Sequence, residues 1–258
     1  MIKKVIIVSF ACFGMSLMAL YTARTKKVSN PPPMEFIDTP VVVLELFTSQ
    51  GCSSCPPADA LLDKVKLEFP DEVFALSYHV DYWDYIGWKD PFAKSGHAKK
   101  QREYNSKFGY DGNYTPEMVL NGVIHFVGSN ETKLYTEINA HLKGKAQNGV
   151  QIGKIASEAN KILFDYSVTG SLDHKLLRVV LVIDERITEV KRGENRNRTL
   201  RNSNIVVHEK YLDLEASSGA DSITIPNVVS KTDNLTLVVL VEAENLEVTG
   251  AAKAPVHH

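Results

Sequence analysis

Two cysteines, Cys52 and Cys55, are separated by two residues and follow an apolar run over residues 41–47. A segment with helical spacing begins just after them, and a thiolate near a helix start is stabilised by the helix dipole. We expect Cys52 to be an exposed nucleophile and Cys55 the resolving thiol of a redox pair. Half of a metal site is the second interpretation, although zinc would need about two more ligands and the chain has no second Cys-x-x-Cys.

The first 23 residues have the order of charge and hydrophobicity of an export signal. Lys3 and Lys4 precede an apolar run over residues 5–20. We predict that residues 1–23 are a signal peptide and that the protein is periplasmic or secreted. Because no clean small-x-small cleavage pattern is present, an uncleaved N-terminal anchor is the alternative, and it would be the protein's only membrane contact. Residues 24–39 are proline-rich in part and are predicted to be a linker.

Export affects the interpretation of the cysteine pair. The third cysteine, Cys12, lies in the leader, so Cys52 and Cys55 are the only cysteines of the predicted mature chain. A bridge between them closes a loop too short to stabilise the fold much. An oxidising compartment instead provides partners for exchange, so exported protein thiols or disulfides and a redox partner protein are the expected partners.

The composition excludes a strongly charged surface over the whole molecule. The net charge is −2, and 44% of the residues are hydrophobic, as in soluble globular proteins. We therefore expect no nucleic-acid partner, and we expect neither a cofactor nor a resident metal.

Apolar periodicity predicts which elements position the cysteines. Helix and strand patterns alternate up to about residue 148, and Asn121-Gly122 is typical of a tight hairpin turn. Short strand patterns then follow one another, which is typical of a β-sandwich. The predicted fold class is thus α/β followed by a small all-β domain. The predicted domains are residues 40–148 and 149–250, with a tail over 251–258. The strands predicted in the second domain are 151–155, 161–169, 176–183, 205–214, 222–225 and 234–242.

Three further positions have side chains suited to the same chemistry. Glu45 lies in the apolar run before Cys52, where burial would raise its pKa and allow it to relay a proton to Cys55; a structural carboxylate is the alternative. Thr115-Pro116 precedes a hairpin strand and would present a peptide edge to a substrate if the bond is cis, with an ordinary tight turn as the alternative.

A polar and aromatic cluster follows the predicted strand over residues 73–80. We expect it to line a groove beside the dithiol, with Trp83 contacting the substrate. As a metal site it has suitable ligand types without diagnostic spacing, and packed aromatics with loop-capping carboxylates are the other interpretation. Its members are His79, Asp81, Tyr82, Trp83, Asp84 and Trp88.

A basic run over residues 191–201 is interleaved with asparagine and glycine. This composition is typical of a long solvated hairpin loop. The run contains no aromatic residue on which a base would stack, which argues against nucleic acid and leaves an acidic partner surface as the alternative.

Several motifs together resemble an uncharacterised family of secreted, thioredoxin-like bacterial proteins. The resemblance covers most of residues 41–127 and includes part of the later basic run. The motifs are Leu44-Glu45-Leu46-Phe47-Thr48-Ser49-Gln50-Gly51-Cys52-Ser53-Ser54-Cys55-Pro56-Pro57-Ala58-Asp59, His79-Val80-Asp81-Tyr82-Trp83-Asp84, Gly87-Trp88-Lys89-Asp90-Pro91-Phe92, Gln101-Arg102, Tyr114-Thr115-Pro116, Arg192-Gly193-Glu194-Asn195, Arg198-Thr199-Leu200 and Asn204.

The resemblance implies a thioredoxin-like domain over residues 40–148, with Pro116 in the cis-proline position beside Cys52 and Cys55. Ser53-Ser54 departs from the Gly-Pro that ordinary thioredoxins have between their cysteines. The resulting hypothesis is an extracytoplasmic thiol–disulfide oxidoreductase in which Thr115 and Pro116 hold the substrate backbone. The alternatives are a copper-handling protein and a non-enzymatic interaction platform.

Overall fold

The computed structural model describes residues 40–257, so the predicted leader and linker lie outside the described residues. The elements are strands of four to fifteen residues, three α-helices and one six-residue 3₁₀-helix, η1. In chain order they are β1 (Val42–Thr48), α2 (Pro56–Glu68), β2 (Val73–His79), η1 (Asp81–Ile86), α3 (Ser95–Phe108), β3 (Glu117–Leu120), β4 (Ile124–Val127), α4 (Glu131–His141), β5 (Val150–Glu158), β6 (Lys161–Val168), β7 (Lys175–Glu189), β8 (Thr199–Asp213), β9 (Ser218–Thr224), β10 (Leu235–Ala243) and β11 (Val248–Val256).

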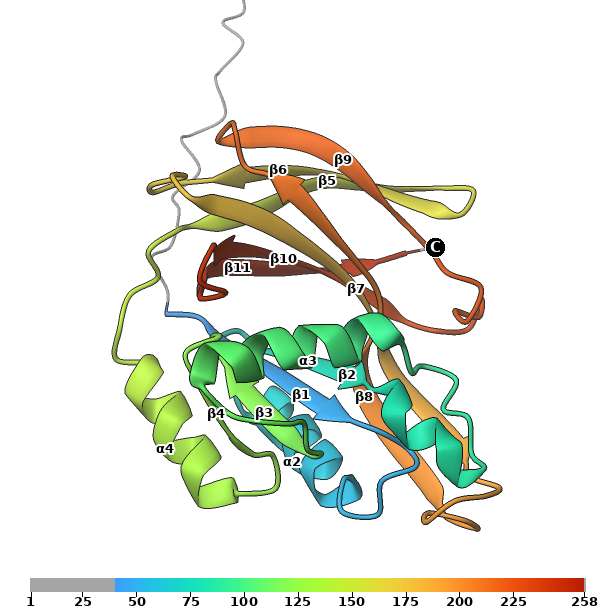
Figure 1. Ribbon diagram of the computed structural model, residues 1–258. Helices are drawn as coiled ribbons and strands as arrows, with labels where there is room; N and C mark the ends of the chain where they lie inside the picture. The colour runs from blue at the N-terminus through green and yellow to red at the C-terminus, as the bar shows by residue number, and fades with distance from the viewer. Residues whose placement is uncertain (1–39, 258) are drawn as a thin grey trace, which may run out of the picture. The chain divides into compact units, whose positions relative to one another are not determined.

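Eight of these strands form one mixed sheet. Its order is β11-β10-β7-β8-β2-β1-β3-β4, and β5-β6-β9 form a second, three-stranded sheet (Figure 1). β1 is parallel to β2 and antiparallel to β3. A strand from each of the two predicted domains meets where β8 runs parallel to β2, with Ser77 opposite Ile205.

Side-chain alternation along β1 assigns its residues to two cores. Leu44 and Leu46 pack under α2 and α4, whereas Val43 and Phe47 face the side that α3 covers. Every residue of β1 is buried, as expected for a strand covered on both faces. The three-stranded sheet packs on β7, β8 and β10 and closes a third core.

The fold class predicted from sequence, a thioredoxin-like α/β domain followed by a separate small β-sandwich, is wrong. The structure is mostly β, and one large mixed sheet contains strands from both predicted parts. Val180, Val206 and Leu240 from the later strands share a core with Phe47 and Tyr78 from the earlier ones. The reason for the error is physical, because an apolar pattern reports that a strand is buried but not which strand pairs with it.

The hairpin predicted at Asn121-Gly122 is confirmed, although its connection has three residues and not two, because Leu120 pairs with Ile124. Both residues have positive φ (49° and 66°) between β3 and β4, as a tight hairpin turn requires. A Cβ at Gly122 would lie 1.9 Å from the carbonyl oxygen of Leu246. The turn is therefore held against the loop before β11, a strand that sequence analysis did not predict.

Candidate functional site

Cys52 and Cys55 form a disulfide in the loop between β1 and α2. Both residues are fully buried. The hydroxyl oxygen of Ser54 lies 3.3 Å from Cys52 Sγ, and the carbonyl oxygen of Thr115 lies 3.9 Å from the same sulfur. The prediction that Cys52 is exposed is therefore wrong for the oxidised protein.

The start of α2 offers no free N–H group to a thiolate. Cys55 is the N-cap residue, and Pro56 and Pro57 occupy the first turn without N–H groups of their own. The next two N–H groups, of Ala58 and Asp59, both donate to the carbonyl oxygen of Cys55, at 2.9 and 3.1 Å. Only the helix dipole, and no direct hydrogen bond from this helix end, remains to stabilise a thiolate.

The three residues predicted to contact substrate lie together beside Cys52. The Thr115–Pro116 peptide bond is cis. Trp83 Nε1 donates to Thr115 Oγ1 at 2.7 Å, and the carbonyl of Pro116 accepts from the N–H of Gly128 at 2.9 Å. The Thr115 carbonyl therefore faces the disulfide from a segment that Trp83 holds in place, while a substrate-binding role for these residues stays a prediction.

Glu45 belongs to a different polar cluster. Its Oε1 accepts from the Tyr104 hydroxyl at 2.6 Å and pairs with the Arg178 guanidinium at 2.8 Å, which also pairs with Glu242 at 2.6 Å. All four side chains are buried. Because side chains alternate along β1, Glu45 lies on the α3 side of the sheet, opposite the face that α2 covers. This geometry does not support a proton relay from Glu45 to Cys55.

A buried ion pair supports the loop that carries the cysteines. His79 Nδ1 lies 2.7 Å from Asp90 Oδ2, and the backbone N–H of Gln50 donates to the same oxygen at 2.8 Å. Burial opposes both charges. In His79, the charge of Asp90 and its hydrogen bond outweigh burial and raise the pKa. In Asp90, the charge of His79 and several hydrogen bonds outweigh burial and lower the pKa. Each partner therefore favours the charged form of the other.

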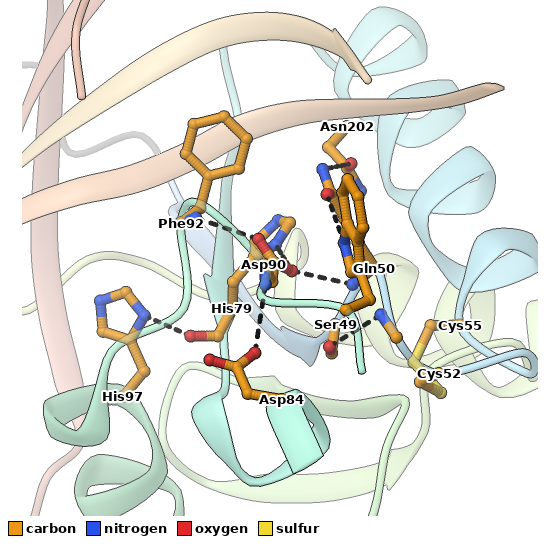
Figure 2. A network of polar contacts seen from close by, with 12 residues as sticks. Ser49, Gln50, Cys52, Cys55, His79, Asp84, Asp90, Phe92, His97 and Asn202 are labelled. Atoms are coloured by element: carbon orange, nitrogen blue, oxygen red, sulfur yellow. Dashed lines mark hydrogen bonds and ion pairs between the residues drawn. A yellow bond between two sulfur atoms is a disulfide. The ribbon is translucent and has the colours of Figure 1, made fainter. Parts of the chain in front are cut away.

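Gln50 joins this ion pair to two distant segments (Figure 2). Its side-chain carbonyl accepts from Trp88 Nε1 at 3.2 Å, and its amide group donates to Asn202 Oδ1 at 3.1 Å. Gln50 is itself buried. Gln50, two positions before Cys52, is thus held by the loop that follows η1, by β8 and by Asp90.

Asp59 is a buried carboxylate that sequence analysis missed. It is 6% exposed and lies one helical turn after Cys55, so the two side chains project from the same side of α2. Burial raises its pKa to about 7, and the charge of His79 opposes part of that rise. Its Oδ1 has no hydrogen-bond partner in the described structure. The available signal was its spacing from Cys55 among the apolar positions of α2.

The connection between β7 and β8 packs onto the cysteine loop. Asn195 is fully buried, and its amide donates to the carbonyl oxygens of Gln50 (3.0 Å) and Cys52 (2.8 Å). Arg198 donates to Asn195 Oδ1 at 2.8 Å, and Glu194 Oε2 accepts from the backbone N–H of Ser53 at 3.0 Å. The prediction of a solvated loop is therefore wrong for this part of the basic run. The family-like motif over residues 192–195 was the sequence signal for the contact between this segment and the cysteine loop.

Within residues 40–257, no three His, Cys, Asp or Glu side chains converge so as to hold a metal ion. None of the helices in this described range is both long and apolar enough to cross a membrane.

Asp84 of the predicted aromatic cluster accepts a hydrogen bond from the backbone N–H of Asp90 at 3.1 Å, so it supports the loop around the ion pair.

Comparison with known proteins identifies the family. The chain matches, over residues 43–242, the family described as Protein of unknown function (DUF1223). Because the match covers most of the chain, this protein belongs to that family, which confirms the expectation of an uncharacterised family. A search of curated proteins found no match.

Two solved structures resemble the whole described fold. A crystal structure of a protein from Agrobacterium tumefaciens is 26% identical, with a TM-score of 0.62, and the match covers 84% of this chain and 97% of that chain. HBP35 of Porphyromonas gingivalis is 15% identical, with a TM-score of 0.59, over 86% of this chain and 77% of that chain. The second likeness concerns the fold alone.

Proposed function

We propose that this member of the DUF1223 family is a thiol–disulfide oxidoreductase that acts outside the cytoplasm on exported proteins. The observation that carries the proposal is the Cys52–Cys55 disulfide at the junction of β1 and α2, with the Thr115 carbonyl beside Cys52 Sγ. A disulfide that spans two residues contributes little to stability, so exchange chemistry is its better explanation. The leader predicted from residues 1–23 supports the location.

The reaction is a two-electron exchange between a substrate dithiol and this disulfide. A substrate thiolate attacks Cys52 Sγ, the Cys52–Cys55 bond breaks, and Cys55 leaves as a thiolate. The second substrate thiol then attacks the mixed disulfide and releases Cys52. The substrate is oxidised to a disulfide, both cysteines are reduced, and the reverse sequence reduces a substrate disulfide.

Asp59, in place of Glu45, is the group that we assign to proton transfer with Cys55. It is buried beside the first turn of α2, and a pKa of about 7 suits a group that accepts and returns a proton at neutral pH. Its unpartnered Oδ1 is free to bond a thiol that forms only when the disulfide opens.

Exchange also requires the cover over Cys52 to move. Ser54 lies on one side of the sulfur and also donates from its hydroxyl to the Thr115 carbonyl at 3.4 Å. Ser53 and Ser54 are exposed, so rotation of this short turn opens the sulfur without disturbing a core.

Single cysteine variants test the proposal. With Cys55 replaced by serine, Cys52 has no resolving partner. Its thiolate is expected to attack a disulfide of a protein with scrambled disulfides, release one thiolate of that protein, and remain trapped in a mixed disulfide. Cys52→Ser is the matched control, which keeps Cys55 and is expected to trap much less. Intact-protein mass spectrometry under non-reducing conditions measures both. Equal trapping by the two variants, or none by either, contradicts the proposal.

The complete burial of both cysteines favours one second candidate function. If the cover never opens, the disulfide is a rigid part of a non-enzymatic interaction platform. Native protein would then keep its disulfide in millimolar glutathione, and reduction would follow only after unfolding. The rate at which glutathione reduces the folded protein, compared with its unfolding rate, separates the two candidates.

A further inference from the structure

An open groove lies beside the cysteine loop, and its lining is basic. We call it the arginine groove. Its lining residues are Ile86, Lys191, Arg192, Gly193, Glu194 and Arg196. The chain as a whole has a net charge of −2, so this concentration of positive charge is local.

The groove begins at the cysteine loop itself. Glu194 accepts the backbone N–H of Ser53 at 3.0 Å, which places the groove wall one residue from Cys52. A Cβ built on Gly51 would lie 3.2 Å from Ile86 Cδ1, and one built on Gly193 would lie 2.9 Å from the same atom. Ile86 therefore packs between the cysteine loop and the β7–β8 connection, and anything bound in the groove lies next to the disulfide.

The two arginines carry charge that the protein does not neutralise. Arg192 and Arg196 are exposed, and neither pairs with a carboxylate anywhere in the described range 40–257. Lys191 pairs with Glu189, but the two side chains are 68% and 71% exposed. An ion pair exposed to this extent contributes little to stability. The groove thus offers unpaired cations to a ligand.

The single acidic group of the lining does not cancel this charge. Hydrogen bonds from Ser53 lower the pKa of Glu194 and so favour its negative charge, but the same lining carries three cations, Lys191, Arg192 and Arg196. Exposed guanidinium groups bind carboxylates through paired N–H donors. Charge complementarity therefore favours an acidic ligand.

We infer that the arginine groove binds acidic residues close to the reacting cysteine of a polypeptide substrate. This inference rests on the proposed function and specifies its substrate class: extended chains with Asp or Glu within a few residues of the cysteine. A polypeptide is favoured over a nucleic acid because no aromatic side chain lines the groove for base stacking.

Peptide exchange rates test the inference. Three peptides would share one cysteine-containing core, flanked by Asp and Glu, by Asn and Gln, or by Lys. At low salt the acidic peptide is expected to react with wild-type protein about tenfold faster than the amide peptide, because complementary charge raises association rates. This ratio is expected to approach one in about 1 M salt, where the screening length falls to about 3 Å.

Charge reversal locates the effect. In the double variant Arg192→Glu and Arg196→Glu, the ratio of acidic to amide peptide rates is expected to fall to one or below. Lys99→Glu with Arg102→Glu is the matched control, since it makes the same charge change on exposed positions of α3, and it should keep most of the preference.

Three outcomes would overturn the inference and leave the proposed function intact. The first is that wild-type protein reacts with all three peptides at equal rates, and the second is that both double variants lose the preference equally. The third is that a single-stranded oligonucleotide competes more strongly than a peptide of the same charge. Failure of every peptide to exchange with wild-type protein would instead reject the proposed function itself.

Discussion

Replacing Asp59 by asparagine removes a buried carboxylate whose charge the fold disfavours. The pKa of Asp59 rises from its ordinary 3.8 to about 7 in the folded protein, chiefly because burial raises it. The folded state therefore holds this proton over a pH range in which the unfolded chain has released it. Between these two values the unfolded state binds fewer protons, so the free energy of unfolding falls as pH rises and levels off above about pH 7.

The size of this effect follows from the difference between the two pKa values. A difference of about three corresponds to a loss of up to about 4 kcal/mol across the window. Asparagine has nearly the same shape and no charge to release, so the variant does not lose this stability. The stability of Asp59→Asn relative to wild type is expected to increase by up to about 4 kcal/mol from about pH 4 to about pH 8.

Urea unfolding of oxidised protein at several pH values measures this difference. Asp63→Asn is the matched control, because Asp63 lies on the same helix and pairs with the exposed Arg201 at 3.1 Å. An equal pH-dependent gain in this control would show that the effect is not specific to Asp59. A pH-independent difference between wild type and Asp59→Asn would refute the argument. If Asp59 also transfers protons, the variant's exchange rate should lose its rise near neutral pH.

The two other polar clusters give predictions of their own. Arg178→Met leaves Glu45 buried without its cation and leaves Glu242 with only Lys100, at 3.8 Å. Urea unfolding should therefore show a loss of about 3–5 kcal/mol, partly recovered by adding Glu242→Gln. A loss under about 1 kcal/mol would contradict a role for this charge pairing. Asn195→Ala removes the donor to two carbonyls of the cysteine loop and should cost about 1–3 kcal/mol for each carbonyl left buried. The exposed Asn160→Ala is its control, and an equal effect of both substitutions would show that these two bonds do not matter.

Local features of the fold were predictable because neighbouring residues determine them. The Asn121-Gly122 turn follows from backbone conformations that few other residue pairs adopt easily. The strand before Cys52 and the helix after Cys55 follow from runs of apolar spacing. For the same reason, the position of the cysteine pair between them was visible in the sequence.

The partners of these elements were not predictable in the same way. Glu45 looked like a proton relay because it is buried and near Cys52 in sequence, yet strand alternation turns it toward Arg178 on the far face of the sheet. Asn195 looked solvated because its neighbours are charged, yet it bonds to Cys52 across 143 residues. Burial is a property of sequence pattern, whereas the identity of a buried partner depends on how distant strands dock.

The sequence by itself thus determined that a Cys-x-x-Cys pair stands between a buried strand and a helix, because hydrophobic period and turn chemistry act over a few residues. Only the tertiary structure decided that β8 pairs with β2 to make one mixed sheet. That pairing brings the β7–β8 connection onto the cysteine loop, where Asn195 and Glu194 bond to it, and places the groove lined by Arg192 and Arg196 next to that loop. These contacts depend on strand order, which local periodicity does not encode.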